Sequence, residues 1–222
     1  MNKEFLQSLR EQIKSGTVTE QEPMSRHTSF SIGGPADVFV QPATKEEIKN
    51  AIFCAKEAGV PFFVMGNGSN LLVSDEGFRG MIIQIGKNFQ EISVQDTVIE
   101  VQAGALLSRT ARAAWNAGLT GFEFAAGIPG TTGGAVAMNA GAYGGEMKQI
   151  VESAEVLTSE GEVLNLTNEE LGMGYRTSVI AKNDYVALSA VLKLEKGDRQ
   201  EIRAYMEDLK ERRVTKQPLE FG

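Results

Sequence analysis

The residues that build disulfides, metal sites and membrane anchors are scarce in this sequence. Cys54 is the only cysteine and His27 the only histidine among 222 residues. A single cysteine cannot form a disulfide within the chain, and one histidine excludes a histidine-rich metal site. No stretch approaches the ~18 apolar residues of a membrane-spanning helix, and residues 1–16 lack a signal-peptide core. We expect a cytoplasmic protein with no membrane partner and no bound metal.

Positive charge is also in short supply. The chain has 22 lysines and arginines against 29 acidic residues, a net charge of −7, and no long basic run. Because binding to nucleic-acid phosphates requires a basic stripe, nucleic acid is excluded as a partner. An anionic ligand would have to be held by main-chain N–H groups and a few individually placed cations.

Glycine, in contrast, is abundant and clustered. The chain has 24 glycines, more than the usual ~7% of residues. Residues 121–145 contain eight of them and a single charged residue, Glu123. A solvated linker is usually polar, so we expect this backbone to pack closely against a ligand or against the protein itself.

Hydrophobic periodicity and turn residues predict a mixture of helices and strands. The segment that precedes Thr28 is polar and receives no element, whereas Thr44 and Glu47 have the spacing of a helix capping box. Because helices and strands do not alternate strictly, we expect an α+β fold rather than a doubly wound sheet. Helices are predicted near 5–13, 44–58, 106–117, 167–170 and 198–213, and strands near 37–40, 62–65, 71–73, 81–85, 91–94, 98–103, 150–157, 162–166 and 186–194.

Residues 66–70, Gly-Asn-Gly-Ser-Asn, form the first candidate ligand loop. Successive N–H groups of such a loop can converge on a phosphate without help from a basic side chain. The lysine of a nucleoside-triphosphate P-loop and the third glycine of a Rossmann turn are both absent. On this loop alone, a plain tight turn between two strands remains the alternative.

Residues 127–135, Gly-Ile-Pro-Gly-Thr-Thr-Gly-Gly-Ala, form the second candidate loop. Pro129 stiffens the turn, its glycines allow close approach, and Thr131 and Thr132 stand where a helix could start. A helix N-terminus directed at an anion would add a favourable dipole. The alternative is the tight packing of a buried glycine-rich turn.

Four segments in this order and spacing resemble the MurB family of UDP-N-acetylenolpyruvoylglucosamine reductases. They are HTSFSIGGPADVFV (27–40), GNGSNLLVSDEGFRGMII (66–83), AAGIPGTTGGAVAMNAGAYGGE (125–146) and GYRTS (174–178). The resemblance implies a two-subdomain FAD-binding fold of the vanillyl-alcohol-oxidase (PCMH) type. It implies FAD-binding subdomains at 1–86 and 87–197, with FAD between them, and the start of a substrate-binding domain at 198–222.

The same resemblance implies the reaction and the site. FAD is held non-covalently, NADPH reduces it, and a UDP-sugar enolpyruvyl ether, UDP-N-acetylglucosamine-enolpyruvate, becomes UDP-N-acetylmuramate. The implied substrate-binding residues are Tyr143, Arg176 and Lys196. The implied cofactor-binding residues are Met65, Gly66, Asn67, Gly68, Ser69, Asn70, Leu71, Gly127, Pro129, Gly130, Thr131, Thr132, Gly133, Gly134, Ala135, Asn139, Gly141 and Val186.

Arg176 is the catalytic residue that the resemblance implies, and the chemistry explains why. Hydride addition to an unsaturated carboxylate builds negative charge onto that carboxylate, and a fixed guanidinium binds the group and stabilises the growing charge. The alternative role is an ordinary ion pair. His27 is assigned as a partly buried histidine rather than as a covalent flavin attachment point, and Cys54 as helix packing.

The sequence departs from the family pattern in two places. Strand residue Val186 follows Arg176 within ten residues, as in the shorter members that lack a tyrosine-bearing insertion. The serine and glutamate that the family places after QPLEFG are not in the sequence. We therefore expect a truncated chain, monomeric and able to bind FAD, that reduces its substrate poorly or not at all. Another FAD-dependent oxidase of the same fold and a non-catalytic nucleotide-binding module remain the alternatives.

Overall fold

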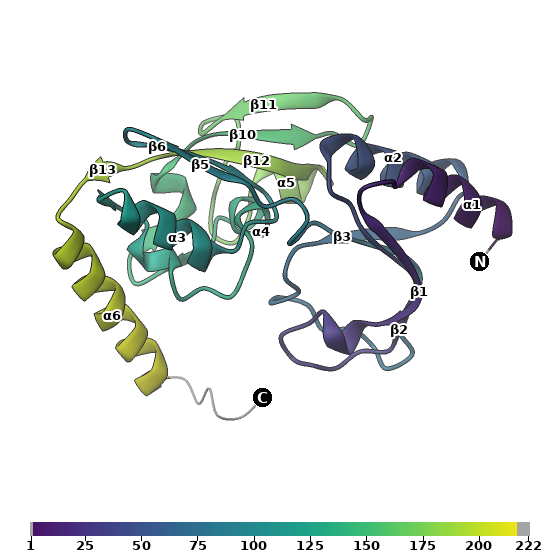
Figure 1. The fold of residues 1–222 in the computed structure, drawn as a ribbon, viewed down its shortest axis with the longest axis horizontal. Helices are drawn as coiled ribbons and strands as arrows, with labels where there is room; N and C mark the ends of the chain where they lie inside the picture. Colours follow the sequence, from purple (N-terminus) through teal and green to yellow (C-terminus); the bar gives the residue numbers. More distant parts are fainter. Residues whose placement is uncertain (1, 217–222) are drawn as a thin grey trace. The chain divides into compact units, whose positions relative to one another are not determined.

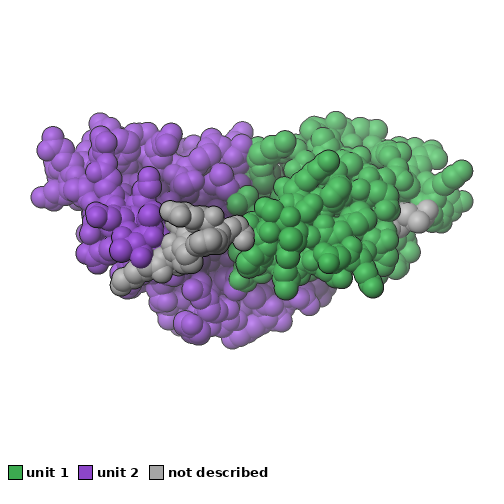
Figure 2. All heavy atoms as spheres, turned by 90° about the horizontal axis from the view of Figure 1, so that it is seen from below, with its two compact units in different colours: residues 1–89 green, residues 90–222 purple. Residues whose placement is uncertain are grey.

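A computed structural model describes residues 2–216 and divides the chain into two compact units, residues 1–89 and 90–222 (Figure 2). Each unit contains both helices and strands (Figure 1), so the expected α+β class is confirmed. Each unit also has its own sheet, and no hydrogen-bonded ladder joins the two sheets among the described residues. The three-part domain division with boundaries after 86 and 197 stays a prediction.

Unit 1 is built on a mixed sheet with the strand order β1-β2-β4-β3. Strand β1 is antiparallel to β2, and β2, β4 and β3 run parallel. Helix α2 provides the crossover between β2 and β3 and packs beside α1 (Figure 1). The bounds are α1 Lys3–Gln12, β1 Thr17–Pro23, the 3-10 turn Met24–Arg26, β2 Pro35–Gln41, α2 Lys45–Glu57, β3 Phe62–Met65 and β4 Phe78–Gln84.

The sheet of unit 1 buries a different set of side chains on each face. Phe39, Met65 and Ile82 belong to a cluster that Leu71 and Val73 also contact. Because side chains alternate along a strand, the residues that precede and follow Phe39 and Ile82 in sequence point to the opposite face of the sheet. The helices pack on that face. Removing these apolar side chains from water supplies most of the stability of such a layered fold.

Three expectations for secondary structure are wrong. The polar segment 17–23 forms edge strand β1, because pairing with β2 compensates for its lack of apolar residues. Residues 71–73 form no strand; Leu72 is exposed, and the segment runs irregularly over the core. At 167–170 there is a turn instead of a helix, in which the Glu170 carboxylate accepts hydrogen bonds from the N–H and the hydroxyl of Thr167, both at 2.8 Å.

Unit 2 is built on an antiparallel sheet with the strand order β11-β10-β12-β6-β5. The short helix α4 packs against β12, at the centre of this sheet. No helix in the described part of the chain is both long and apolar enough to cross a membrane. The bounds are β5 Ile92–Gln95, β6 Val98–Gln102, α3 Leu107–Asn116, β7 Leu119–Thr120, α4 Thr132–Ala137, β8 Gly141–Ala142, β9 Gly145–Glu146, β10 Val151–Leu157, β11 Val163–Thr167, α5 Val179–Lys182, β12 Val186–Lys193, β13 Glu195–Lys196 and α6 Arg199–Lys216, with 3-10 turns at Glu123–Ala125 and Met147–Gln149.

Trp115 joins α3 to α6. Its indole Nε1 donates a hydrogen bond to the carbonyl oxygen of Arg199 at 2.9 Å, and the guanidinium carbons of Arg199 and Arg203 lie 5.7 and 5.8 Å from its ring centre. The ring is consequently half-buried rather than part of the core. Phe122 and Phe124 are buried.

Glu47 fastens the start of α2 to the connection between α1 and β1. Thr44 caps the helix by accepting the N–H of Glu47, but the Glu47 carboxylate does not complete the capping box. Its Oε1 accepts the N–H groups of three consecutive residues, 14–16, at 2.6–3.3 Å, and its Oε2 accepts that of Ala43 at 2.8 Å. Burial alone would raise the pKa of this carboxyl, but these four bonds hold the pKa below its usual value of 4.5.

Glu47→Gln should lower the free energy of unfolding by about 2 kcal/mol at pH 7, because an amide group places an N–H against a main-chain N–H. Since the folded pKa of Glu47 is lowered, its stabilising effect is full above 4.5 and is lost as the pH falls through the folded pKa. Urea denaturation of both proteins from pH 7 downward checks this. Glu46→Gln, an exposed acid in the same helical turn, is the control and should cost less than about 0.5 kcal/mol. If both variants lose the same free energy of unfolding, the hydrogen bonds of Glu47 do not stabilise the fold as proposed.

Candidate functional site

The loop at 66–70 leaves the end of β3 and lies against residues 27–29. Gly68 adopts a left-handed φ of 65°, and a Cβ atom there would overlap the carbonyl oxygen of His27. The N–H of Ser29 donates to the carbonyl oxygen of Gly68 at 3.3 Å. A glycine is therefore required at position 68 both by the backbone conformation and by the close approach of another segment.

The same loop contains main-chain N–H groups that have no acceptor among the described residues. Within residues 2–216, the N–H groups of Asn67, Gly68 and Ser69 donate no hydrogen bond. Unpaired main-chain N–H groups are uncommon in folded proteins unless water or a ligand meets them. Three successive free donors at a positive-φ glycine are the arrangement in which a backbone nest binds an anion.

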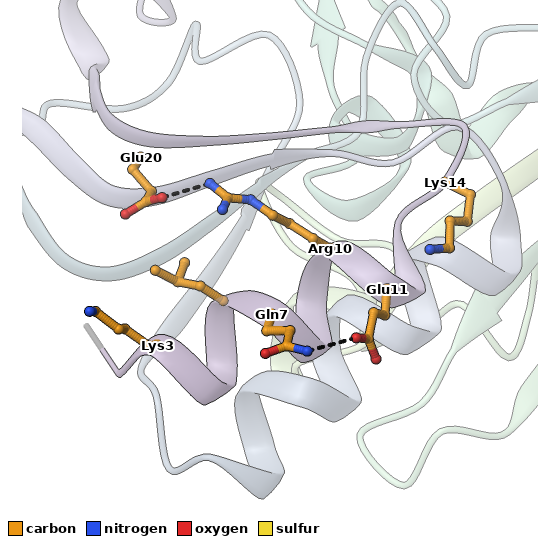
Figure 3. A pocket seen from close by; sticks show the side chains of 7 residues that line it. Lys3, Gln7, Arg10, Glu11, Lys14 and Glu20 are labelled. Atoms are coloured by element: carbon orange, nitrogen blue, oxygen red, sulfur yellow. Dashed lines mark hydrogen bonds and ion pairs between the residues drawn. The ribbon is translucent and has the colours of Figure 1, made fainter.

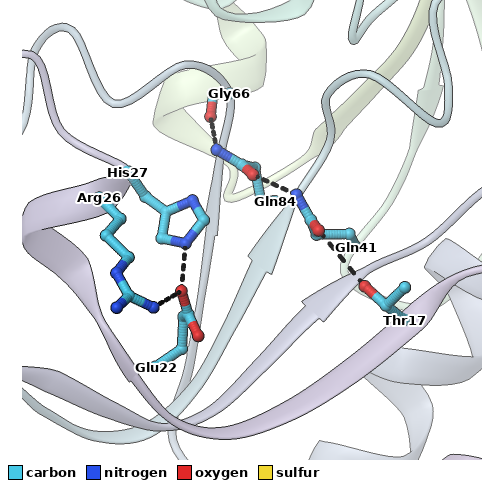
Figure 4. Close-up of polar contacts among 7 residues, drawn as sticks. All are labelled: Thr17, Glu22, Arg26, His27, Gln41, Gly66 and Gln84. Carbon is cyan, nitrogen blue, oxygen red and sulfur yellow. Dashed lines mark hydrogen bonds and ion pairs between the residues drawn. The ribbon is translucent and has the colours of Figure 1, made fainter.

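A relay of polar side chains fixes the start of this loop (Figure 4). Gln84 Nε2 donates to the carbonyl oxygen of Gly66 at 3.2 Å, and Gln41 Nε2 donates to Gln84 Oε1 at 2.7 Å. The hydroxyl of Thr17 donates to Gln41 Oε1 at 3.3 Å. The relay was not predicted from the sequence. The sequence feature that could have indicated it is a glutamine at the end of each of two neighbouring strands.

His27 is partly buried, as expected, and is held by protein groups. Its Nε2 lies 3.0 Å from Glu22 Oε1, and its ring centre lies 4.1 Å from that of Phe39. Arg26 also approaches Glu22, at 3.7 Å (Figure 4). One ring nitrogen of the imidazole is therefore engaged with a carboxylate.

The second loop uses most of its polar groups internally. The N–H groups of Thr132 and Gly133 donate to the carbonyl oxygens of Ala105 and Ala103 at 2.8 and 2.9 Å, and the hydroxyl of Thr132 also bonds to Ala105 at 3.2 Å. A Cβ atom at Gly133 would lie 2.7 Å from the Cβ of Ala103. The expected helix start is confirmed as α4, but its first amides meet protein carbonyls. Tight packing thus accounts for this half of the loop.

The other half of the loop is open to solvent. Gly127, Pro129 and Gly134 are exposed, whereas Thr131, Thr132 and Ala135 are buried. Among the described residues, the N–H groups of Thr131 and Gly134 have no acceptor. Any ligand of this loop would meet its exposed glycines and these two amides.

Arg176 lies at the tip of a two-residue turn. Gly174 and Thr177 exchange main-chain hydrogen bonds of 3.0 and 3.3 Å, which leaves Tyr175, 92% exposed, and Arg176 outside the ladder. Arg176 has a left-handed φ of 56°. No acidic side chain in the described part of the chain forms an ion pair with it. Among the residues that the structure describes, the structural ion pair considered from the sequence is therefore not formed.

Tyr143 and Asn139 share the left-handed backbone of Arg176, with φ of 54° and 43°. The guanidinium carbon of Arg213 lies 6.0 Å from the Tyr143 ring centre, and a Cβ atom at Gly127 would lie 3.1 Å from Arg213 Nε. Sequence analysis did not single out Arg213. Two further predicted positions lie in strands: Gly141 begins β8, and Val186 is buried at the start of β12, and their contact with FAD stays a prediction.

Lys196 is engaged in an exposed contact with Asp96. Its ammonium group lies 2.9 Å from the Asp96 carboxylate and donates to the Asp96 carbonyl oxygen at 3.1 Å. The hydrogen bond from Lys196 to the Asp96 carboxylate, and then the charge of the ammonium group, hold the pKa of Asp96 below its usual range. A substrate would have to compete with Asp96, so the role predicted for Lys196 stays a prediction.

Unit 1 also carries a surface hollow of about 570 Å³ (Figure 3). It is bordered by α1 and β1, and Arg10 bonds to Glu20 across it at 2.6 Å. None of the predicted site residues lines it. Its lining residues are Lys3, Leu6, Gln7, Arg10, Glu11, Lys14 and Glu20.

Comparison with known sequences gives a consistent result. The FAD binding domain family matches residues 36–167. The chain is 48% identical over 221 residues to the UDP-N-acetylenolpyruvoylglucosamine reductase of Clostridioides difficile, covering all of this chain and 73% of that protein. It is 52% identical over 212 residues to the reductase of the same name from Alkaliphilus oremlandii, covering 96% of this chain and 70% of that protein.

Solved structures agree with the sequences. The crystal structure of UDP-N-acetylenolpyruvylglucosamine reductase (MurB) from Thermus caldophilus superposes with a TM-score of 0.76 and 36% identity, covering 90% of this chain and 70% of that one. A Phl p 4 variant, a glucose dehydrogenase, superposes with a TM-score of 0.63 at 15% identity, which shows a shared fold alone. The FAD-binding fold expected from the sequence is confirmed.

Gly68→Ala should destabilise unit 1 by about 2–4 kcal/mol, from backbone strain at positive φ and from overlap with His27. Gly59→Ala is the matched control, because Gly59 has nearly the same φ, 62°, and nothing within 4 Å of an added Cβ. It should cost about 1 kcal/mol, from strain alone. Urea denaturation followed by circular dichroism measures both losses. If the two variants lose the same stability, the close approach to His27 does not constrain the loop.

Proposed function

Because the chain belongs to the UDP-N-acetylenolpyruvoylglucosamine reductase family, we propose that it binds FAD non-covalently and uses NADPH to reduce UDP-N-acetylglucosamine-enolpyruvate to UDP-N-acetylmuramate, for peptidoglycan synthesis. The observation that carries the proposal is the row of unpaired N–H groups at 67–69 within a segment that matches the FAD binding domain family. We also propose that the protein acts in the cytoplasm as a monomer.

The residues present suit a dinucleotide cofactor. A diphosphate needs several converging donors, and in a protein of net charge −7 the main chain is the available source. The amides of residues 67–69 would hold the diphosphate, and the relay through Gln84 fixes the start of their loop. The exposed backbone at Gly134 has no side chain to obstruct a flat ring system, whereas the Arg213 side chain lies against Gly127.

The chain itself contributes the recognition of the substrate's carboxylate. When bound, FAD would supply the chemistry of hydride transfer between NADPH and the enolpyruvyl double bond. Arg176 has no acidic partner among the described residues, so its guanidinium is free to bind a carboxylate. The charge that develops on that carboxylate during hydride addition would be stabilised at the same point.

The visible spectrum of the purified protein tests the cofactor and the reductant together. We expect the protein to carry the flavin absorption band, NADPH to bleach it without oxygen, and the enolpyruvyl substrate to restore it. Denaturation should then release FAD, because no covalent bond holds it. The control is a second reduced sample that receives UDP-N-acetylglucosamine, which lacks the enolpyruvyl group and should not restore the band.

Other outcomes would point elsewhere. A colourless protein that takes up no added FAD, or flavin that NADPH does not bleach, would contradict the proposal. Either result would indicate a non-catalytic nucleotide-binding module. Flavin that stays attached after denaturation, combined with rapid restoration of the band by oxygen alone, would indicate an oxidase.

Arg176→Met should weaken binding of the enolpyruvyl substrate by roughly 10–100-fold, the effect of losing a charge-assisted contact. It should also slow substrate-dependent restoration of the flavin band by about 10²–10³-fold. Stopped-flow absorbance separates this step from reduction by NADPH, which should keep its rate. The control is Arg203→Met, another exposed arginine of unit 2, which pairs with Glu207. Arg176 has no catalytic role if both variants behave alike.

A further inference from the structure

Two buried side chains tether the turn that carries Arg176. Asn139 Nδ2 donates to the carbonyl oxygen of Gly174 at 3.1 Å, just before the turn. The hydroxyl of Ser178 donates to the carbonyl oxygen of Ala137 at 2.7 Å, just after it. Asn139 is 4% exposed and Ser178 is fully buried. The turn is therefore attached at both ends to the segment that runs from α4 into the loop after it.

Asn139 uses its amide group fully within the protein. Its Nδ2 also donates to Glu146 Oε2 at 3.0 Å, and its Oδ1 accepts the N–H of Lys148 at 2.8 Å. Both of its donor hydrogens and its acceptor oxygen thus have protein partners. The amide therefore has no donor hydrogen left for a cofactor, and the predicted contact of Asn139 with FAD stays a prediction.

The hydrogen-bond partners of Asn139 lie close in sequence to Tyr143 and Arg176, the two substrate-binding residues that the resemblance implies for this region. Tyr143 lies in the loop that the bond from Asn139 to Glu146 closes, and Arg176 lies in the turn that the bond to Gly174 holds. Glu146 is itself fixed, because its main-chain N–H donates to Gln149 Oε1 at 3.0 Å. One amide group therefore sets the position of two segments whose contacted residues, Glu146 and Gly174, are 28 residues apart in the chain.

The turn needs such an attachment because packing cannot hold it. Its tip residue Tyr175 is 92% exposed, and Arg176 adopts a left-handed backbone that a non-glycine residue rarely keeps without support. If the bond to Gly174 is removed, we expect the turn to relax and the guanidinium group to lose its fixed place.

We propose that Asn139, together with Ser178, is a positioning residue that holds Arg176 and Tyr143 in the geometry needed to bind the enolpyruvyl carboxylate. The catalytic part of this inference depends on the function proposed above, whereas the tether itself does not. Neither side chain is assigned contact with the reacting atoms.

Hydrogen exchange tests the tether without any assay of activity. In Asn139→Ala, amides in residues 174–179 should exchange at least tenfold faster than in the wild type. The matched control is Asn168→Ala, because Asn168 Nδ2 also donates to two main-chain carbonyl oxygens, at 2.6 and 2.8 Å, and these belong to Val151 and Lys148 rather than to the turn. Ser178→Ala removes only a hydroxyl and is the second variant if Asn139→Ala does not fold; it should also speed exchange at 174–179. Unchanged exchange at 174–179 in both variants would overturn the inference.

The two steps of the reaction test the catalytic part. Misplacement by about 1 Å can cost a reaction roughly 10²-fold in rate. Asn139→Ala should therefore slow restoration of the flavin band by the substrate about 10–100-fold, and Ser178→Ala, which lies outside the implied FAD-binding set, should slow restoration while bleaching by NADPH keeps its rate. If Arg176→Met slows restoration but Asn139→Ala and Ser178→Ala do not, the positioning role is wrong. If Arg176→Met has no effect while exchange is still faster in Asn139→Ala, the tether stands and the proposed function falls, together with the catalytic part of this inference.

Discussion

Segments rich in glycine have few side chains that could fix them by packing, so their positions depend on hydrogen bonds to main-chain atoms. In this protein those bonds come from polar side chains elsewhere in the same unit. Gln84 holds the carbonyl oxygen of Gly66, and Asn139 holds that of Gly174. A buried amide left without its partner would cost free energy, so each of these contacts specifies one loop geometry.

The two glycine-rich loops meet this requirement differently. The loop at 66–70 is anchored through Gly66 and keeps successive N–H groups unpaired, which suits it to an anion. The loop at 127–135 gives the N–H groups of Thr132 and Gly133 to protein carbonyls and exposes its other glycines. One loop is thus built around free donors, and the other around close packing.

Charge and strain point to the same part of unit 2. Several arginines of the described chain have acidic partners, Arg10, Arg79, Arg203 and Arg212 among them, whereas Arg176 has none. Arg176 and Tyr143 both adopt left-handed backbone, which bulky residues adopt at a cost. Strained backbone persists where surrounding contacts determine it, and such positions cluster at functional sites. The contacts of Asn139 and Ser178 are the surrounding structure in this case.

The sequence by itself determined the α+β class, most helices and strands, both glycine-rich loops and the family, because periodicity, turn residues and motif order are local properties. Prediction from the sequence was wrong where the local pattern of a segment does not match its place in the tertiary structure. The polar segment 17–23 becomes a strand only by pairing with β2, and the apolar run 71–73 packs on the core without pairing. Only the tertiary structure decided that Glu47 would clamp residues 14–16, that the first amides of α4 would meet carbonyl oxygens, and that Asn139 would reach Gly174. A hydrogen bond between residues far apart in sequence depends on where the fold places both partners, and no spacing along the chain records that distance.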